Sequence, residues 1–236
     1  MRFQLIKLTA CLAFVPGTLF VCSAAAQAPS QPIWRLDNTT SIGGYAPKVM
    51  GHPEVIDTPM GKAVHFNGVD DALFFPVHPL AGDATWTWEM IFKPDADGRQ
   101  AQRIFHLQSV DPATGEDIKN ERMLFEIRIV NGQWCLDSFA TAGGQARTLL
   151  NCDKLHPFGK WYRVTAVYDG KILRNYVGDE LQGEGELAIP AERPGRSSLG
   201  TRIDLRDYYK GAVYEARFTP RALPPKEFLN IPGEKR

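Results

Sequence analysis

The chain has no excess of charge of either sign, because 27 lysine and arginine residues balance 27 aspartate and glutamate residues among its 236 positions. Proteins that bind nucleic acid usually carry a basic excess, so this balance argues against nucleic acid as a partner. The sequence also contains no glycine-rich phosphate loop, no Cys-x-x-Cys pair and no recognisable Ser-His-Asp set. It therefore offers no motif for nucleotide binding, for a paired-cysteine metal site or for a serine nucleophile.

Long apolar runs are also missing beyond the N-terminus. There, Arg2 and Lys7 form a basic segment, residues 8–21 are mostly apolar, and small residues follow in the pattern that signal peptidase recognises. A Pro-Gly pair interrupts the apolar run, which is shorter than the roughly 20 residues of a membrane-spanning helix. We therefore predict a signal peptide over residues 1–28 and a secreted or periplasmic domain, residues 29–236, without a transmembrane segment.

Helical periodicity is scarce as well. No segment keeps a 3.6-residue apolar period for three turns, and only residues 223–231 are typical of a short helical turn. Instead, short stretches of alternating apolar and polar residues recur, separated by Gly, Pro, Asn or Asp, and together they predict an all-β sandwich or barrel. The predicted strands lie near residues 62–67, 72–77, 85–93, 102–108, 123–130, 133–139, 146–151, 161–168, 171–177 and 211–219.

Several short segments predict tight turns between these strands. Asn131-Gly132 is the strongest short-range hairpin signal, and Asp169-Gly170 predicts a turn of the same sort. The residues from Asn67 to Asp71, with the sequence Asn-Gly-Val-Asp-Asp, also combine turn-forming types. Their Gly allows positive φ, and their Asn and Asp side chains bond to nearby backbone. We expect these acids first to shape a hairpin.

Only two cysteines, Cys135 and Cys152, lie outside the predicted signal peptide. A hairpin centred between Gly143 and Gly144 would place Cys135 eight residues before the turn and Cys152 eight residues after it. The two would then face each other across the ladder at a separation that suits a disulfide, which an exported protein can form. Two buried free thiols are the alternative.

Alternation also predicts which side of each strand is buried. In the stretch LFEIRIV, Phe125, Ile127 and Ile129 share one face, whereas Glu126 and Arg128 lie on the other. If the two charges are exposed, their pair is worth under about 1 kcal/mol, and Arg128→Ala should hardly affect folding. We expect several of the polar-face residues to gather on one sheet. These residues are Glu89, His106, Glu126, Arg128 and Arg163.

Four stretches, taken together and in this order, resemble the laminin-G-like and concanavalin A-like lectin/glucanase superfamily. They are GKAVHFNGVDDALFFP (61–76), ATWTWEMIFKPDADG (84–98), GKWYRVTAVYDGKILRNYVGDEL (159–181) and YKGAVYEARFTPRALPPKEF (209–228). The resemblance implies a single jelly-roll domain of two antiparallel sheets, one convex and one concave. It does not choose a function, because this superfamily includes sugar-binding modules, protein-binding modules, glycoside hydrolases and polysaccharide lyases.

Two enzymatic alternatives follow from the resemblance. A retaining hydrolase needs two neighbouring carboxylates, but Glu89 is the only acid in its strand, so it would have to face Glu126 across strands. A lyase needs a cation and a base, for which His106, Arg128 and Tyr209 could serve. The companion motifs of jelly-roll alginate lyases are missing, however, so we do not predict an enzyme.

We predict instead a module, without catalysis, that binds a polysaccharide or glycoconjugate on the concave face. A protein-interaction or envelope-structural module remains a second alternative. The resemblance also implies a structural Ca²⁺, for which loop residues Asp70 and Asp71 are the candidate ligands. Tyr208 and Tyr209 lie in a polar stretch and are the first candidates to stack on a sugar ring. The predicted ligand-binding residues are Glu89, His106, Glu126, Arg128, Arg163, Tyr208 and Tyr209.

Overall fold

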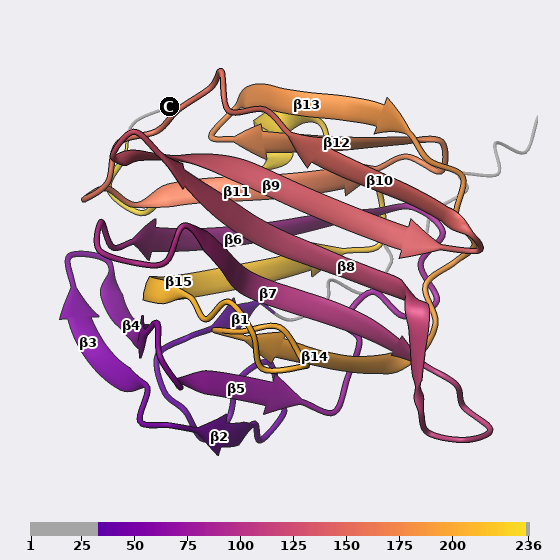
Figure 1. The fold of residues 1–236 in the computed structure, drawn as a ribbon, viewed down its shortest axis with the longest axis horizontal. Coiled ribbons are helices and arrows are strands. Elements are labelled where there is room, and N and C mark those ends of the chain that lie inside the picture. Colours follow the sequence, from indigo (N-terminus) through magenta and orange to yellow (C-terminus); the bar gives the residue numbers. More distant parts are fainter. Residues whose placement is uncertain (1–32, 235–236) are drawn as a thin grey trace, which may run out of the picture.

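Two antiparallel β-sheets pack face to face in the computed structural model, which describes residues 33–234 (Figure 1). This architecture confirms the predicted all-β jelly-roll sandwich. The predicted signal peptide lies outside the described residues. Within those residues, no helix is long and apolar enough to cross a membrane.

One sheet has eight strands in the order β13-β12-β11-β6-β15-β4-β3, with β1 paired to β15 at the side of this path. Every pairing in it is antiparallel. Its strands are β1 (Trp34–Arg35), β3 (Glu54–Thr58), β4 (Gly61–Asn67), β6 (Trp86–Pro94), β11 (Tyr162–Tyr168), β12 (Ile172–Val177), β13 (Glu180–Glu186) and β15 (Lys210–Thr219).

The other sheet has seven strands in the order β10-β9-β8-β7-β14-β5-β2, also antiparallel, and lies in front in Figure 1. Its strands are β2 (Lys48–Met50), β5 (Ala72–Phe75), β7 (Ala101–Val110), β8 (Asp117–Val130), β9 (Gln133–Ala142), β10 (Gln145–Leu150) and β14 (Gly195–Leu199).

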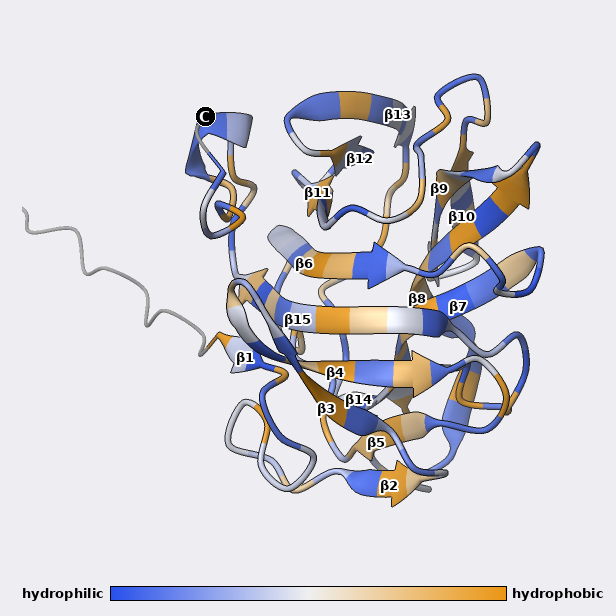
Figure 2. Cartoon of the chain, turned by 90° about the vertical axis from the view of Figure 1, so that its left-hand side faces the viewer, coloured by the Kyte–Doolittle hydropathy of each residue, from blue (hydrophilic) through white to orange (hydrophobic). Residues whose placement is uncertain are grey.

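The core fills the space between the two sheets with most of the side chains that alternation predicts to be buried, among them Phe125 and Ile127 but not Ile129, which is partly exposed. Trp88 of β6 packs on Phe125 of β8, with ring centroids 4.1 Å apart, so aromatic contacts join one sheet to the other. Figure 2 shows the two sheets edge on as separate layers. With the inner faces used for the core, any binding surface built on strands must lie on an outer face.

Tight turns fix the register of the long hairpins. Asn131 and Gly132 both have positive φ, 51° and 72°, and Gly143 and Gly144 have φ of 57° and 79°. These values are those of a two-residue turn that Asn-Gly and Gly-Gly favour. The prediction of the same turn type at Asp169-Gly170 is wrong, because only Gly170 has positive φ. Here Asp169 Oδ1 accepts the N–H groups of Lys171 and Ile172 instead.

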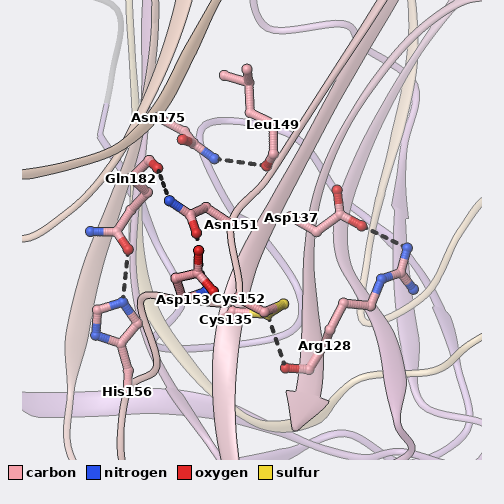
Figure 3. Close-up of a disulfide and its surroundings, with 10 residues drawn as sticks. All are labelled: Arg128, Cys135, Asp137, Leu149, Asn151, Cys152, Asp153, His156, Asn175 and Gln182. Atoms are coloured by element: carbon pink, nitrogen blue, oxygen red, sulfur yellow. Dashed lines mark hydrogen bonds and ion pairs between the residues drawn. A yellow bond between two sulfur atoms is a disulfide. The ribbon is translucent and has the colours of Figure 1, made fainter.

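The disulfide between Cys135 and Cys152 is confirmed (Figure 3), with an S–S distance of 2.01 Å and a Cα–Cα distance of 5.1 Å. The β9–β10 register pairs Gln145 with Ala142 and Leu150 with Asp137, as equal spacing about the Gly-Gly turn requires. The bridge therefore ties the segment after β10 to the start of β9.

The C-terminal strap, residues 220–231, lies across the outer face of the eight-stranded sheet (Figure 2). Leu229 packs with Ile91 and Ala63 of that sheet, while Leu223 and Phe228 pack with Val167. The strap contains a short 3₁₀ helix, Pro225–Glu227, where a helical turn is predicted. The strap does not reach the outer face of the seven-stranded sheet, which is covered in part by the loop between β14 and β15.

Candidate functional site

A groove lined by many charged residues lies on the outer face of the seven-stranded sheet. Its largest cavity, about 740 Å³, is lined by residues that include His106, Arg122, Arg196 and Arg202. A cavity of about 170 Å³ lies next to it, because Arg122 and Arg202 line both. A third cavity, about 310 Å³, shares Arg196 with the first and is lined by Phe74. We call these three neighbouring cavities the outer groove.

Strand alternation and one loop place the groove side chains. His106 on β7 pairs with Leu124 on β8 and Ser198 on β14, so residues of the same face stand side by side across three strands. Arg196 on β14 holds both oxygens of Asp117 at 2.8 and 2.6 Å, an ion pair that fixes one wall. The loop between β14 and β15 supplies Arg202.

His106 is a neutral donor at the floor of the groove. Its side chain is buried, and its Nδ1 accepts the backbone N–H of Ile203 at 3.0 Å, so the ring proton must sit on Nε2. Burial, and then the charges of Arg202 and Arg122, lower the pKa of His106 to about 3. Among the described residues, Nε2 has no acceptor.

A pair of carboxylates lies in the smaller cavity. Glu126 on β8 is directly opposite Asp137 on β9, and Nη2 of Arg128 reaches both, at 2.9 and 2.6 Å. Arg103 holds the other Glu126 oxygen at 2.9 Å. Burial, and then the neighbouring Asp137, raise the pKa of Glu126. The cluster can hydrogen-bond to a ligand, but its charges also stabilise one another.

The groove brings together three of the predicted ligand-binding residues, His106, Glu126 and Arg128. The other charged residues of the groove were not predicted. Asp137 had a usable signal, because it lies five residues after Asn131-Gly132 and Glu126 lies five before it. The remaining ones are Lys48, Arg103, Glu116, Asp117, Lys119, Arg122, Arg196, Arg202 and Asp204.

Glu89 and Arg163 lie on the opposite side of the sandwich, which corrects the expectation that they share a face with His106. Both are buried under the C-terminal strap, where they bind the backbone of the same residue, Leu229. Glu89 Oε1 accepts the N–H of Leu229 at 2.6 Å, and Arg163 Nη1 donates to the Leu229 carbonyl. Glu89 also pairs with Arg217 at 2.5 Å. These contacts hold the strap. Glu89 cannot pair with Glu126, because the two residues lie on the outer faces of different sheets.

The tyrosine pair is also buried, although it follows a polar loop. Tyr209 is 0% exposed, packs between Phe66 and Phe92, and donates its hydroxyl to the Lys93 carbonyl at 3.0 Å. Tyr208 is 9% exposed. This corrects their expected exposure: Tyr209 offers no face to a sugar ring. It also separates Tyr209 from His106, so the three lyase candidates are not assembled.

The acids of the opening hairpin accept hydrogen bonds from backbone and side-chain amides. Asp71 accepts the His52 N–H at 2.7 Å and the Asn67 N–H at 2.9 Å, one with each oxygen, and Asp70 accepts the Asn67 side-chain amide at 2.8 Å. Both thus act as turn formers. No cluster of three or more His, Cys, Asp or Glu suited to a metal ion occurs in residues 33–234. Calcium binding by Asp70 and Asp71 stays a prediction.

Comparison with known proteins gives one family match. A family model described as the concanavalin A-like lectin/glucanases superfamily matches residues 67–228. No curated protein matches the chain.

Similar solved structures share the fold at low identity. Domain 4 of AbnA, a GH43 extracellular arabinanase from Geobacillus stearothermophilus, in complex with arabinotriose, is 18% identical with a TM-score of 0.61, over 84% of this chain and 95% of that one. The botulinum neurotoxin serotype D binding domain is 10% identical with a TM-score of 0.58, over 84% of this chain and 49% of that one. The serotype D ligand binding domain in complex with N-acetylneuraminic acid is 10% identical with a TM-score of 0.56, over 84% and 48%. The chain thus spans about half the length of the toxin domains.

Proposed function

The chain belongs to the concanavalin A-like lectin/glucanase superfamily, and we propose that it is a carbohydrate-binding module whose ligand occupies the outer groove. We propose further that it acts outside the cytoplasm, on a polysaccharide or glycoconjugate. The disulfide between Cys135 and Cys152 supports this location, because such bonds persist in oxidising compartments.

One observation carries the proposal: the C-terminal strap covers one outer face of the sandwich, whereas the other outer face carries a groove. The C-terminal strap covers the eight-stranded sheet with apolar contacts made by Leu223, Phe228 and Leu229. The seven-stranded sheet instead carries the outer groove, with cavities of about 740, 310 and 170 Å³ that share residues. A concave surface of this size is the usual place for a small-molecule or sugar ligand.

The chemistry of the groove supports a sugar ligand. A sugar presents many hydroxyl groups, which donate and accept hydrogen bonds, together with less polar C–H faces. The groove offers buried donors on His106 and Arg122, and carboxylate acceptors on Glu126 and Asp137. Phe74 and Phe139 supply apolar surface in the two flanking cavities. The fold neighbours that bind arabinotriose and N-acetylneuraminic acid agree with this class of ligand.

Retention on insoluble polysaccharides and a glycan array test the proposal. We expect Arg202→Ala to weaken binding by roughly 10- to 100-fold, the loss of a charged hydrogen bond. Arg174→Ala is the matched control, because Arg174 has a side-chain exposure of 25% against 23% for Arg202 but lies on the other sheet. Equal binding by both variants, or no glycan bound by the parent protein, would refute the proposal.

The facing of Glu126 and Asp137 favours a second candidate, hydrolysis of a glycan held in the same groove. A retaining glycosidase uses two carboxyl groups about 5 Å apart, one of them protonated, and burial raises the pKa of Glu126. Measurement of new reducing ends in the retained polysaccharide separates the two functions. Reducing ends that disappear in Glu126→Gln would establish hydrolysis, and their absence would leave binding alone.

A further inference from the structure

We infer that the outer groove selects anionic glycans, whose carboxylate or sulfate group binds among Arg122, Arg202 and His106. This inference rests on the proposed glycan site. Arg122 and Arg202 line both the largest and the smallest cavity, so they stand where these two cavities meet. His106 lines the largest cavity beside them.

Arg122 has no carboxylate within ion-pair distance in residues 33–234, although Asp204 and Glu126 lie near enough to favour its charge. Its Nη1 donates to the Lys119 carbonyl, and its guanidinium carbon lies 5.0 Å from the centre of the Phe139 ring. Its Nε is buried and has no acceptor, and Arg122 forms no ion pair with any residue in the described part of the chain. Burial, and next the charge of Arg202, lower the pKa of Arg122. An anion between the two arginines would offset both effects, because its opposite charge favours the charged form of each.

Arg202 is only partly neutralised. Its Nε is 3.2 Å from Asp204 Oδ1, but Arg206 takes the other oxygen of Asp204 at 2.5 Å. One carboxylate thus serves two guanidinium groups. Arg202 keeps room for a further acceptor, because a guanidinium group has five N–H donors.

The other carboxylates near the groove do not fill this role. Asp117 is bound at both oxygens by Arg196. Glu126 and Asp137 are bound by Arg103 and Arg128 at 2.6 to 2.9 Å. Glu116 is exposed and forms no ion pair among the residues described.

His106 supplies the third donor to the same cavity. Because Ile203 fixes the tautomer, Nε2–H is a buried donor that lacks an acceptor within residues 33–234. A buried donor without an acceptor costs free energy, which a ligand oxygen would recover. A neutral sugar hydroxyl could satisfy this donor, but only an anion also offsets the facing charges of Arg122 and Arg202. The combination therefore favours an acidic sugar over a neutral one.

A glycan array that carries uronate, sialylated and sulfated glycans, each beside its neutral counterpart, tests the inference. For the uronates the counterpart is the methyl ester, which removes the charge and adds one methyl group. We expect at least tenfold tighter binding of the acidic member, with an affinity that falls as salt is raised. The arm that shows the preference identifies carboxylate or sulfate as the recognised group. Equal binding of both members overturns the inference while the proposed function stands, whereas no binding at all overturns both.

Two substitutions place the selectivity in named residues. Arg122→Gln removes the unpaired charge, and His106→Asn keeps an acceptor for the Ile203 N–H while removing the Nε2–H donor. We expect Arg122→Gln to weaken binding of the acidic glycan about tenfold or more, and to change binding of its neutral counterpart less than threefold. His106→Asn should weaken binding of both glycans, because a hydroxyl and an anion can each accept from Nε2–H. Arg174→Gln serves as the control, and thermal unfolding checks that each variant is folded. Loss of both glycans in equal measure in Arg122→Gln would show that this arginine supports the groove without selecting charge.

Discussion

Arg128 places one guanidinium nitrogen between two buried carboxylates, 2.9 Å from Glu126 and 2.6 Å from Asp137. The side chains of Glu126 and Asp137 are 7% and 2% exposed. Without Arg128, two facing carboxylates would remain in a site of low dielectric with only Arg103 as a partner. Alternation predicts that Glu126 and Arg128 form an exposed pair and that Arg128→Ala hardly affects folding. This prediction is wrong, because the carboxylates that Arg128 binds are buried.

We expect Arg128→Ala to lower the free energy of unfolding by about 3 kcal/mol, the typical effect of breaking a buried ion pair from one side. The double variant Arg128→Ala/Asp137→Asn should recover most of this loss, because it removes one of the two facing charges. Urea unfolding of the parent, single and double variants measures both effects. A loss below 1 kcal/mol in the single variant would show that the cluster is well solvated.

The C-terminal strap is an element held mainly by side chains of the sheet beneath it. Arg163 donates to the Leu229 carbonyl, binds Asp179 at 2.5 Å, and lies 5.1 Å from the Phe228 ring. Glu89 binds the amide of the same Leu229. The strap therefore buries two charged side chains, and its docking depends on both.

We expect Arg163→Met to lower the free energy of opening the strap by about 1–3 kcal/mol, because a charged hydrogen bond is lost. Native-state hydrogen exchange of the Leu229 amide measures this opening directly. Arg174→Met, on the neighbouring strand, should leave Leu229 protection unchanged. Unchanged protection in Arg163→Met as well would mean that apolar packing alone holds the strap.

The strands and the disulfide were predictable wherever the signal is local. Equal spacing about Gly143-Gly144 places Cys135 opposite Cys152, and the same reasoning about Asn131-Gly132 would have paired Glu126 with Asp137. Five strands, β1, β2, β3, β13 and β14, were missed, because they are short or polar. GRSSL of β14, for example, has no alternation.

The groove itself could not be read from local pattern. Arg196 and Arg202 reach it because β14 pairs with β7, which brings Ser198 beside His106 across 92 positions of sequence. Likewise, alternation places Glu89 and Arg163 on an outer face, but it cannot show that the strap folds back over that face. Burial by a distant segment is a tertiary effect, and the alternation of residues within one strand carries no information about it.

At the scale of the whole molecule, buried groups outside the groove make stability depend on pH. Burial raises the pKa of Glu192 to about 8 and lowers that of His78 to about 4, and the two side chains are 3.9 Å apart. Both are therefore neutral at pH 7. The raised pKa of Glu192 gives stability that is complete below pH 4.5 and is lost as pH rises to about 8. The lowered pKa of His78 gives stability that is complete above pH 6.5 and is lost as pH falls to about 4.

Glu192→Gln should remove the contribution of Glu192 to the loss at high pH. Between pH 6.5 and 8, we expect the free energy of unfolding to fall less steeply with pH in the variant than in the parent. The two slopes should differ by about 1.4 kcal/mol per pH unit. Urea unfolding across this range measures the difference, with the exposed Glu54→Gln as control. Parallel curves for the parent and Glu192→Gln would show that Glu192 is ionised without cost.

We assign the glycan to the outer groove of the seven-stranded sheet, and a crystal structure of the protein with its tightest glycan from the array tests this assignment most directly. We expect sugar density along the outer groove, between His106 and Arg128, with an anionic group within hydrogen-bond distance of Arg122 and Arg202. Sugar bound on the side of the C-terminal strap, or at the loops along the edge of the sandwich with the outer groove empty, would contradict it.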